Sequence, residues 1–193
     1  MGSKVAFITG ASRGIGKASA IALAQKGYDV VVTARTLEEG EAYEHGSRDS
    51  EVKPMPGSLR ATAAEIETHG RRALPIRLDL LDLASIDAAV ERVYAEWGRI
   101  DLLVNNGIYQ GPGIMSPVDE LTQQHLHDIF RGNVFANVHT IQRVLPRMLA
   151  QGEGCIVNVV SESGMIDPPA AAGKGGWGFA YGASKAALIR MAG

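Results

Sequence analysis

The sequence has 193 residues, of which 46% are hydrophobic, 21% charged and 6% aromatic. This length and composition suit one globular domain, residues 1–193, with a sizeable core, and they argue against general disorder. The formal net charge is only −2, so the chain has no electrostatic footprint for nucleic acid or an anionic membrane. We therefore expect small molecules or proteins as partners.

The sequence shows no pattern typical of a targeting signal or a metal site. No apolar stretch approaches ~18 residues, and we expect neither a membrane span nor a signal peptide. The single cysteine, Cys155, lies in an apolar run, which predicts a buried core thiol. His125 and His127 are two residues apart, on different sides of a helix, and do not form a metal pair. These features favour a cytoplasmic protein without a metal site.

The chain begins with a predicted strand, a glycine-rich turn and a helix. Residues 4–9 have strand composition, residues 15–26 have a helical pattern, and residues 9–16 between them read TGASRGIG. Such a turn makes an anion site, because glycines permit tight geometry and the first helical turn leaves N–H groups unpaired. A pyrophosphate is the expected ligand. A purely structural turn stays open as the alternative, because 23 of the 193 residues are glycine.

Strands and helices alternate along the rest of the chain. The patterns predict strands at 29–34, 73–78, 101–105 and 155–160, and helices at 58–69, 83–97, about 122–150 and from 181 onward. Polar residues 38–57 predict a surface insertion, partly helical over 37–43 and otherwise mobile. Apolar strands alternating with amphipathic helices specify a doubly wound α/β fold, with a parallel sheet covered on both faces.

Polar side chains fall at the carboxyl ends of these strands, where such sheets bind ligands. They are Thr9, Arg35, Asp79, Asn105 and Ser161.

The final helix opens with the segment YGASK, which places Tyr181 and Lys185 four residues apart on one face. A tyrosine is a poor acid–base group near neutrality, but an ammonium one turn away stabilises its phenolate. We interpret Tyr181 as the general acid that protonates a carbonyl, or as the base toward an alcohol. The hydroxyl of Ser161 would hold the substrate oxygen. The alternatives are a surface pair for Tyr181 and Lys185, and a loop cap for Ser161.

Together these motifs resemble the short-chain dehydrogenase/reductases, which use NAD or NADP. The residues that carry the resemblance are TGASRGIG, Leu78-Asp79-Leu80, Asn105-Asn106, Asn133, Ser161 and YGASK. The resemblance covers essentially the whole sequence. It implies a Rossmann fold and hydride transfer between a nicotinamide cofactor and a carbonyl or alcohol substrate, with the catalytic residues Asn133, Ser161, Tyr181 and Lys185.

The resemblance also implies individual roles. Lys185 would hydrogen-bond the nicotinamide ribose, Asn133 would position a relay water, Asp79 would face the adenine, and Asn105 would support the cofactor. Asn133 could instead be an ordinary helix residue, and Asp79 an acid at a helix N-terminus. Homo-oligomers are expected by analogy alone. The expected cofactor-binding residues are Gly10, Ser12, Arg13, Gly14, Ile15, Gly16, Arg35, Asp79, Leu80, Asn105, Tyr181 and Lys185.

The residue after the second strand bears on the choice of cofactor. An NAD site usually has an acid about 20 residues beyond the glycine turn, whereas an arginine there suits a 2′-phosphate. That place holds Arg35, and Arg13 in the glycine turn adds a second cation on the same side. We therefore predict NADP over NAD.

The sequence departs from the family pattern in three places. The usual N-N-A-G reads Asn-Asn-Gly-Ile at 105–108, and the interval from Ser161 to Tyr181 is longer than usual. The sequence also stops at Gly193, whereas the family continues through two more strands and a lid. We expect a fragment with an exposed apolar edge at 155–160, weak NADP binding and poor turnover. A non-catalytic dinucleotide-binding sensor or scaffold remains the alternative function.

Overall fold

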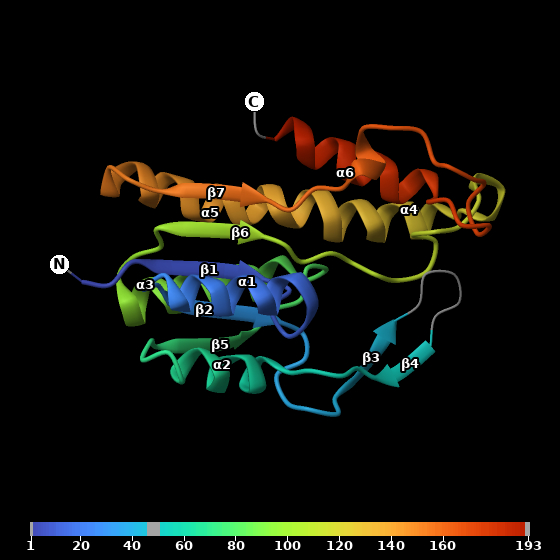
Figure 1. Cartoon of the computed structure of the whole chain (residues 1–193). Coiled ribbons are helices and arrows are strands. Elements are labelled where there is room, and N and C mark those ends of the chain that lie inside the picture. The colour runs from blue at the N-terminus through green and yellow to red at the C-terminus, as the bar shows by residue number, and fades with distance from the viewer. Residues whose placement is uncertain (1, 46–50, 192–193) are drawn as a thin grey trace.

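The computed structural model describes residues 2–45 and 51–191 (Figure 1). Its main sheet has five parallel strands in the order β5-β2-β1-β6-β7, which confirms the predicted doubly wound α/β fold. The carboxyl ends of the strands therefore meet at one edge of the sheet. The strands are β1 (Val5–Thr9), β2 (Asp29–Ala34), β5 (Ala73–Arg77), β6 (Leu102–Asn105) and β7 (Cys155–Asn158).

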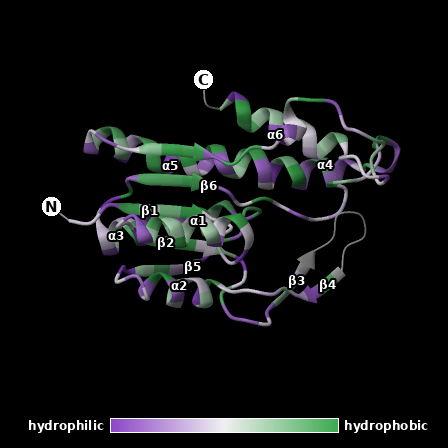
Figure 2. Cartoon of the chain, in the orientation of Figure 1, coloured by the Kyte–Doolittle hydropathy of each residue, from purple (hydrophilic) through white to green (hydrophobic). Residues whose placement is uncertain are grey.

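Helices cover both faces of this sheet. Strand side chains point alternately to the two faces, so that Phe7 packs toward α3 and α5 while Ile8 packs toward α1 and α2. Figure 2 shows the central strands as the most hydrophobic part of the fold. The covering helices are α1 (Gly14–Gln25), α2 (Leu59–Glu67), α3 (Leu83–Trp97) and α5 (Ala136–Gln151).

The helix predicted over 83–97 has those bounds in the structure. Ser58 caps α2, because its hydroxyl accepts a hydrogen bond from the Ala61 N–H at 3.1 Å.

The long helical region predicted at about 122–150 contains a break in its regular hydrogen bonding. It consists of α4 (Gln123–Phe130), the π-helical segment η2 (Arg131–Phe135) and α5. A π turn inserts an extra residue and changes which side chains face inward. Asn133 lies on this turn and is fully buried. The other helical elements of the described chain are η1 (Val118–Glu120), η3 (Glu162–Gly164) and α6 (Phe179–Arg190).

The segment at 38–57 contains an antiparallel hairpin of β3 (Ala42–His45) and β4 (Glu51–Pro54). The predicted helix over 37–43 is wrong, because Gly40 adopts a left-handed φ of +85° that turns the chain into β3. Residues 46–50, where mobility was expected, lie outside the described residues. Figure 1 shows the hairpin beside the edge formed by the strand ends.

Strand β7 forms one edge of the sheet and, among the described residues, pairs only with β6. The prediction of a buried thiol is wrong, because Cys155 lies on this edge strand and is exposed. Val157 and Val160 are 42% and 40% exposed, which confirms the expected apolar edge.

Within the described residues, every helix is too short or too polar to span a lipid bilayer.

Candidate cofactor and catalytic site

The glycine-rich turn brings the start of α1 against the end of β1. Gly10 and Gly14 adopt left-handed φ values of +69° and +55°. A Cβ atom on Gly16 would lie 2.2 Å from the Gly10 carbonyl oxygen and 2.5 Å from Asn106 Nδ2. Glycine at position 16 therefore allows the first turn of α1, with its unpaired N–H groups, to close on the loop.

Asn106 ties the ends of β1 and β6 together. Its Nδ2 donates to the carbonyl oxygens of Thr9 at 2.9 Å and Gly10 at 3.2 Å, and the Thr9 hydroxyl accepts from the Asn106 and Gly107 N–H groups. Asn105 instead donates to Asn158 Oδ1 at 3.0 Å and is buried. The residue of this pair that lines the cavity is therefore Asn106, although Asn105 was predicted to support the cofactor.

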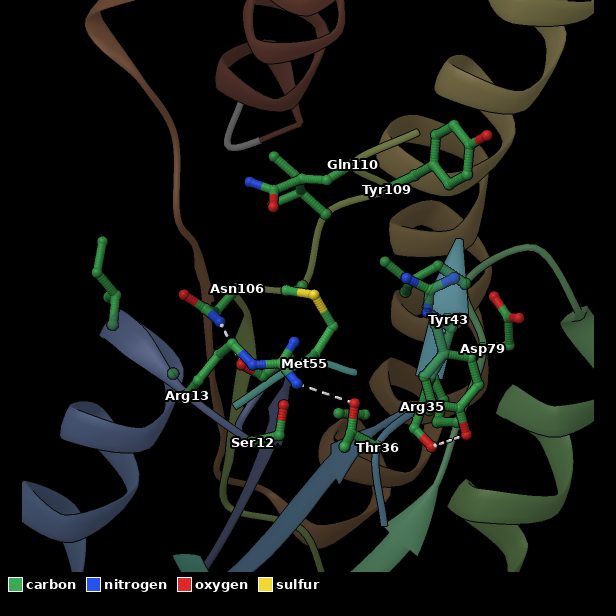
Figure 3. A pocket seen from close by; sticks show the side chains of 18 residues that line it. Ser12, Arg13, Arg35, Thr36, Tyr43, Met55, Asp79, Asn106, Tyr109 and Gln110 are labelled. Atoms are coloured by element: carbon green, nitrogen blue, oxygen red, sulfur yellow. Dashed lines mark hydrogen bonds between the residues drawn. The ribbon is translucent and has the colours of Figure 1, made fainter. Parts of the chain in front are cut away.

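A cavity of about 470 Å³ opens at the carboxyl ends of the strands (Figure 3). Its size lies within the usual range of ligand pockets. The predicted residues that line it are Gly10, Ser12, Arg13, Ile15, Gly16, Arg35, Asp79 and Leu80. The lining residues that sequence reasoning missed are Ala34, Thr36, Tyr43, Met55, Leu78, Asn106, Gly107, Ile108, Tyr109 and Gln110. Four predicted cofactor residues lie outside this lining: Gly14, Asn105, Tyr181 and Lys185.

Two arginines give one wall of the cavity a positive charge. Arg13 donates from Nε to the Pro56 carbonyl oxygen at 2.7 Å and from Nη2 to Thr36 Oγ1 at 2.9 Å. The Arg35 guanidinium lies over the Tyr43 ring, 5.1 Å from its centroid. Burial and the charge of Arg35 lower the pKa of Arg13. The two positive charges repel each other, and an anion bound between them would relieve this repulsion. This wall therefore favours an anionic ligand. Together with the glycine turn, it fits the phosphates of a dinucleotide.

Asp79 faces the cavity and also closes a local turn. Its Oδ1 accepts from the Leu81 N–H at 2.9 Å. The acid that caps α3 is Asp82, whose Oδ1 accepts from the Ala84 N–H at 3.0 Å. The alternative role considered for Asp79, at a helix N-terminus, therefore belongs to Asp82.

Helix α6 carries Tyr181 and Lys185. Lys185 is buried, and its Nζ donates to the Val159 carbonyl oxygen at 2.8 Å, just beyond β7. Burial lowers the pKa of the Lys185 ammonium. Tyr181 is half-buried and packs against a small apolar cluster that includes Ile114 and Ile129.

Ser161 immediately precedes η3, which packs closely on α6. Its hydroxyl accepts from the Ser163 N–H at 3.3 Å and from the Ser163 hydroxyl at 2.9 Å, so it does act as a cap. A Cβ on Gly164 would lie only 2.6 Å from the Ala186 nitrogen, which shows how near the two segments come. Among the described residues, no hydrogen bond directly joins the side chains of Ser161, Tyr181 and Lys185.

Asn133 connects three segments around the candidate catalytic residues. Its Oδ1 accepts from the Tyr109 N–H at 2.7 Å, in the loop that lines the cavity, and its Nδ2 lies 3.3 Å from Ser184 Oγ on α6. Its carbonyl oxygen accepts from Asn137 Nδ2 at 2.6 Å. Asn133 is thus buried and connects the Tyr109 loop with α6.

Comparison with known proteins identifies the family. The family described as short chain dehydrogenase matches residues 4–55 and 44–193. Cyclohexanol dehydrogenase of Rhodococcus sp. (strain TK6) is 35% identical over 192 residues, which are 97% of this chain and 65% of that protein. Sorbitol dehydrogenase of Cereibacter sphaeroides is 36% identical over 162 residues, 83% of this chain and 54% of that protein. This chain belongs to the short-chain dehydrogenase/reductase family, and it spans 54–65% of the length of these two relatives.

Solved structures show the same fold. A metagenomic short-chain oxidoreductase in complex with NADP has a TM-score of 0.78 and 32% identity, covering 97% of this chain and 72% of its own. L-Sorbose reductase from Gluconobacter frateurii, complexed with NADPH and L-sorbose, has a TM-score of 0.79 and 28% identity, with 99% and 62% covered. Carveol dehydrogenase from Mycobacterium avium, in complex with NAD, has a TM-score of 0.78 and 26% identity, with 97% and 62% covered.

Proposed function

We propose that this chain forms the cofactor-binding and catalytic unit of an oxidoreductase that transfers a hydride between NADP and a carbonyl or alcohol substrate. The observation that carries this proposal is the cavity at the strand ends, walled by the glycine turn and two arginines. The solved relatives described above contain NADP, NADPH or NAD, which supports a nicotinamide cofactor.

The charges at the end of β2 support NADP over NAD. An acid there would accept hydrogen bonds from the ribose hydroxyls and repel a 2′-phosphate, whereas Arg35 and Arg13 attract one. We expect isothermal calorimetry to give a lower Kd for NADPH than for NADH. A clear preference for NADH would contradict this part of the proposal.

The bound nicotinamide supplies or accepts the hydride. The Tyr181 phenol gives its proton to the carbonyl oxygen, or takes one from the alcohol, and the Lys185 ammonium one turn away stabilises the phenolate. The Ser161 hydroxyl donates a hydrogen bond to the same substrate oxygen as charge develops there. Asn133 hydrogen-bonds both the Tyr109 loop and α6, and so holds these two segments in place around the catalytic groups.

The substitution Tyr181→Phe tests the acid–base role. It removes the proton donor while keeping the ring, so NADPH-dependent reduction across a panel of aldehydes and ketones should fall at least ~100-fold. NADPH affinity measured by calorimetry should stay within about twofold, because binding of the adenosine and phosphates does not depend on a phenol proton. Tyr28→Phe is the matched control, because Tyr28 packs on the core beneath α1 and lies outside the cavity lining.

A binding protein without catalysis is the second candidate. Two observations favour it: Tyr181 and Lys185 do not line the cavity, and the Ser161 hydroxyl is held by Ser163. It predicts that the 193-residue chain binds NADPH yet converts no member of the carbonyl panel, and that Tyr181→Phe changes neither result. Turnover that disappears in Tyr181→Phe would exclude it.

A further inference from the structure

The β3–β4 hairpin supplies part of the cavity wall at its positively charged side. Tyr43 on β3 and Met55 directly after β4 line the cavity together with Arg35 (Figure 3). The hairpin lies between β2 and α2, so the chain leaves the sheet at Arg35 and returns to it only after the hairpin. The hairpin therefore supplies some of the residues that surround Arg35, and the sheet supplies the others.

Tyr43 is anchored at its hydroxyl and presents its ring to Arg35. The hydroxyl lies 2.7 Å from the Arg35 carbonyl oxygen and 3.2 Å from Glu41 Oε2, and it accepts from Arg77 Nη1. The ring face carries the Arg35 guanidinium at 5.1 Å. One side chain thus contacts both the backbone and the side chain of Arg35.

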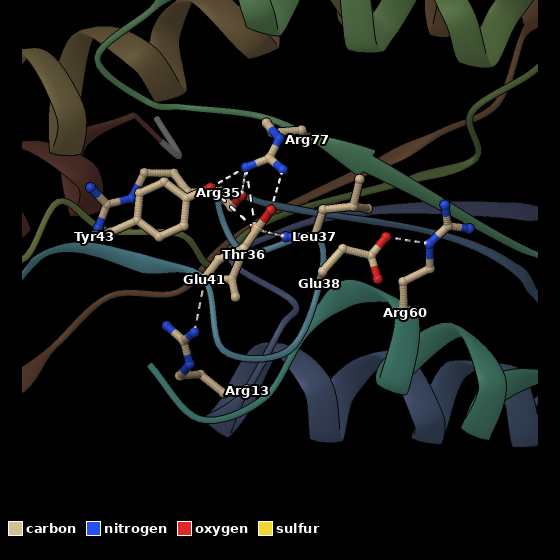
Figure 4. Close-up of polar contacts among 9 residues, drawn as sticks. All are labelled: Arg13, Arg35, Thr36, Leu37, Glu38, Glu41, Tyr43, Arg60 and Arg77. Carbon is tan, nitrogen blue, oxygen red and sulfur yellow. Dashed lines mark hydrogen bonds and ion pairs between the residues drawn. The ribbon is translucent and has the colours of Figure 1, made fainter. Parts of the chain in front are cut away.

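Glu41 and Arg77 fix this arrangement to the sheet (Figure 4). Arg77, at the end of β5, pairs with Glu41 Oε1 at 2.5 Å and donates to the Arg35 carbonyl oxygen at 2.8 Å. Glu41 Oε2 also accepts from the Leu37 N–H at 2.7 Å. The hydrogen bond from Arg77 lowers the pKa of Glu41 to about 2, so the carboxylate is charged at neutral pH.

We propose that the hairpin determines cofactor preference, with Tyr43 as a positioning residue that holds the Arg35 guanidinium toward the 2′-phosphate of the cofactor. This inference rests on the proposed function. Stacking uses the face of the guanidinium, whereas its N–H donors lie in the plane and match phosphate oxygens. A side chain that is already held also loses less rotamer freedom when it binds.

Calorimetry with 2′,5′-ADP and 5′-ADP isolates the contribution of the 2′-phosphate without any turnover. We expect the wild-type chain to bind 2′,5′-ADP more tightly. Tyr43→Ala removes the stacking face and should weaken 2′,5′-ADP binding by roughly 3- to 30-fold, with 5′-ADP unchanged. Tyr43→Phe keeps the ring but loses the hydroxyl anchor, so its preference should be intermediate.

Val52→Thr is the matched control, because Val52 lies on the same hairpin and is 72% exposed. Its two Kd values should equal those of the wild type, and circular dichroism should show that all variants fold. If Tyr43→Ala keeps the wild-type preference for 2′,5′-ADP over 5′-ADP, the inference is overturned while the NADP proposal stands. The same holds if Tyr43→Ala weakens the binding of both ligands equally, because Tyr43 would then have only a structural role. A wild-type chain with no preference for 2′,5′-ADP overturns the NADP proposal and this inference together.

Discussion

Gly14 and Gly16 lie two residues apart in one turn, yet a methyl group would meet different surroundings at each. At Gly16 it would collide with the backbone of Gly10 and the amide of Asn106. At Gly14 nothing lies within 4 Å, and only the left-handed φ of +55° opposes a side chain. Gly16 therefore allows a close approach of the chain, and Gly14 allows a left-handed backbone conformation.

Gly16→Ala should therefore destabilise the protein more than Gly14→Ala. We expect about 1–3 kcal/mol for overpacking at Gly16, together with loss of NADPH binding as the turn opens. Gly14→Ala should cost about 1 kcal/mol, from backbone strain alone. Urea unfolding of both variants gives the comparison. Equal losses, or a larger loss at Gly14, would contradict this account of the turn.

At the scale of the element, the two edge strands differ in how they are covered: the apolar Leu74 and Ile76 of β5 are buried, whereas the apolar residues of β7 are only partly covered. The outer edge of β7 carries backbone groups that no other described strand pairs, and Val157 and Val160 are partly exposed beside it. Such an edge favours pairing with another chain, and a lysine on it is a common protection.

Val157→Lys should reduce self-association of the 193-residue chain. The expected result is a lower mass by light scattering at high protein concentration, with an unchanged circular dichroism spectrum. Leu149→Lys is the control, because Leu149 is 71% exposed on α5 and the substitution adds the same charge on a helix, where no unpaired strand edge is present. A similar decrease in both variants would show that net charge, and not the edge, governs association.

For the whole molecule, the two ends of the sheet have separate roles. The candidate site lies at the carboxyl ends, whereas buried Asp29 and Asp101 lie at the amino ends. Asp29 pairs with Arg71 at 2.5 Å and Arg72 at 2.7 Å, and Asp101 accepts from the Val5 N–H at 2.7 Å. Burial alone would raise the pKa of each carboxyl, but hydrogen bonds from neighbouring arginine and backbone groups lower both pKa values overall.

These lowered pKa values predict a loss of stability in acid. Each carboxylate stabilises the fold fully above the unfolded aspartate pKa of about 3.9, and this contribution disappears as the pH falls through the lower folded pKa. Urea midpoints should therefore drop as the pH falls below about 5. The double variant Asp29→Asn, Asp101→Asn should be less stable at pH 7 and show a smaller acid dependence, while its NADPH affinity at pH 7 stays unchanged. If the stability of the double variant fell as steeply in acid as that of the wild type, Asp29 and Asp101 would not be the source of the acid dependence.

Local patterns predicted much of the fold and part of the site. The α3 bounds, the alternation of strands and helices along the chain and most of the glycine-turn lining followed from hydrophobic spacing and from residues next to one another in sequence. Tyr43 and Met55 carried no such signal, because their place in the cavity depends on a hairpin that lies beside the strand ends. The cavity is likewise lined by Asn106 and not Asn105, since Asn105 bonds to Asn158 on β7 whereas Asn106 bonds to Thr9 at the end of β1. Only the position of β6 between these two strands decides this.

The sequence by itself determined a doubly wound α/β chain with a glycine-rich turn at the end of its first strand and two nearby cations, because spacing and strand-end position are local properties. Only the tertiary structure decided that Cys155 is exposed, that a π turn buries Asn133, and that the 38–57 segment builds a wall of the cavity. The physical reason is that burial depends on which elements become neighbours, and contacts distant in sequence fix those neighbours.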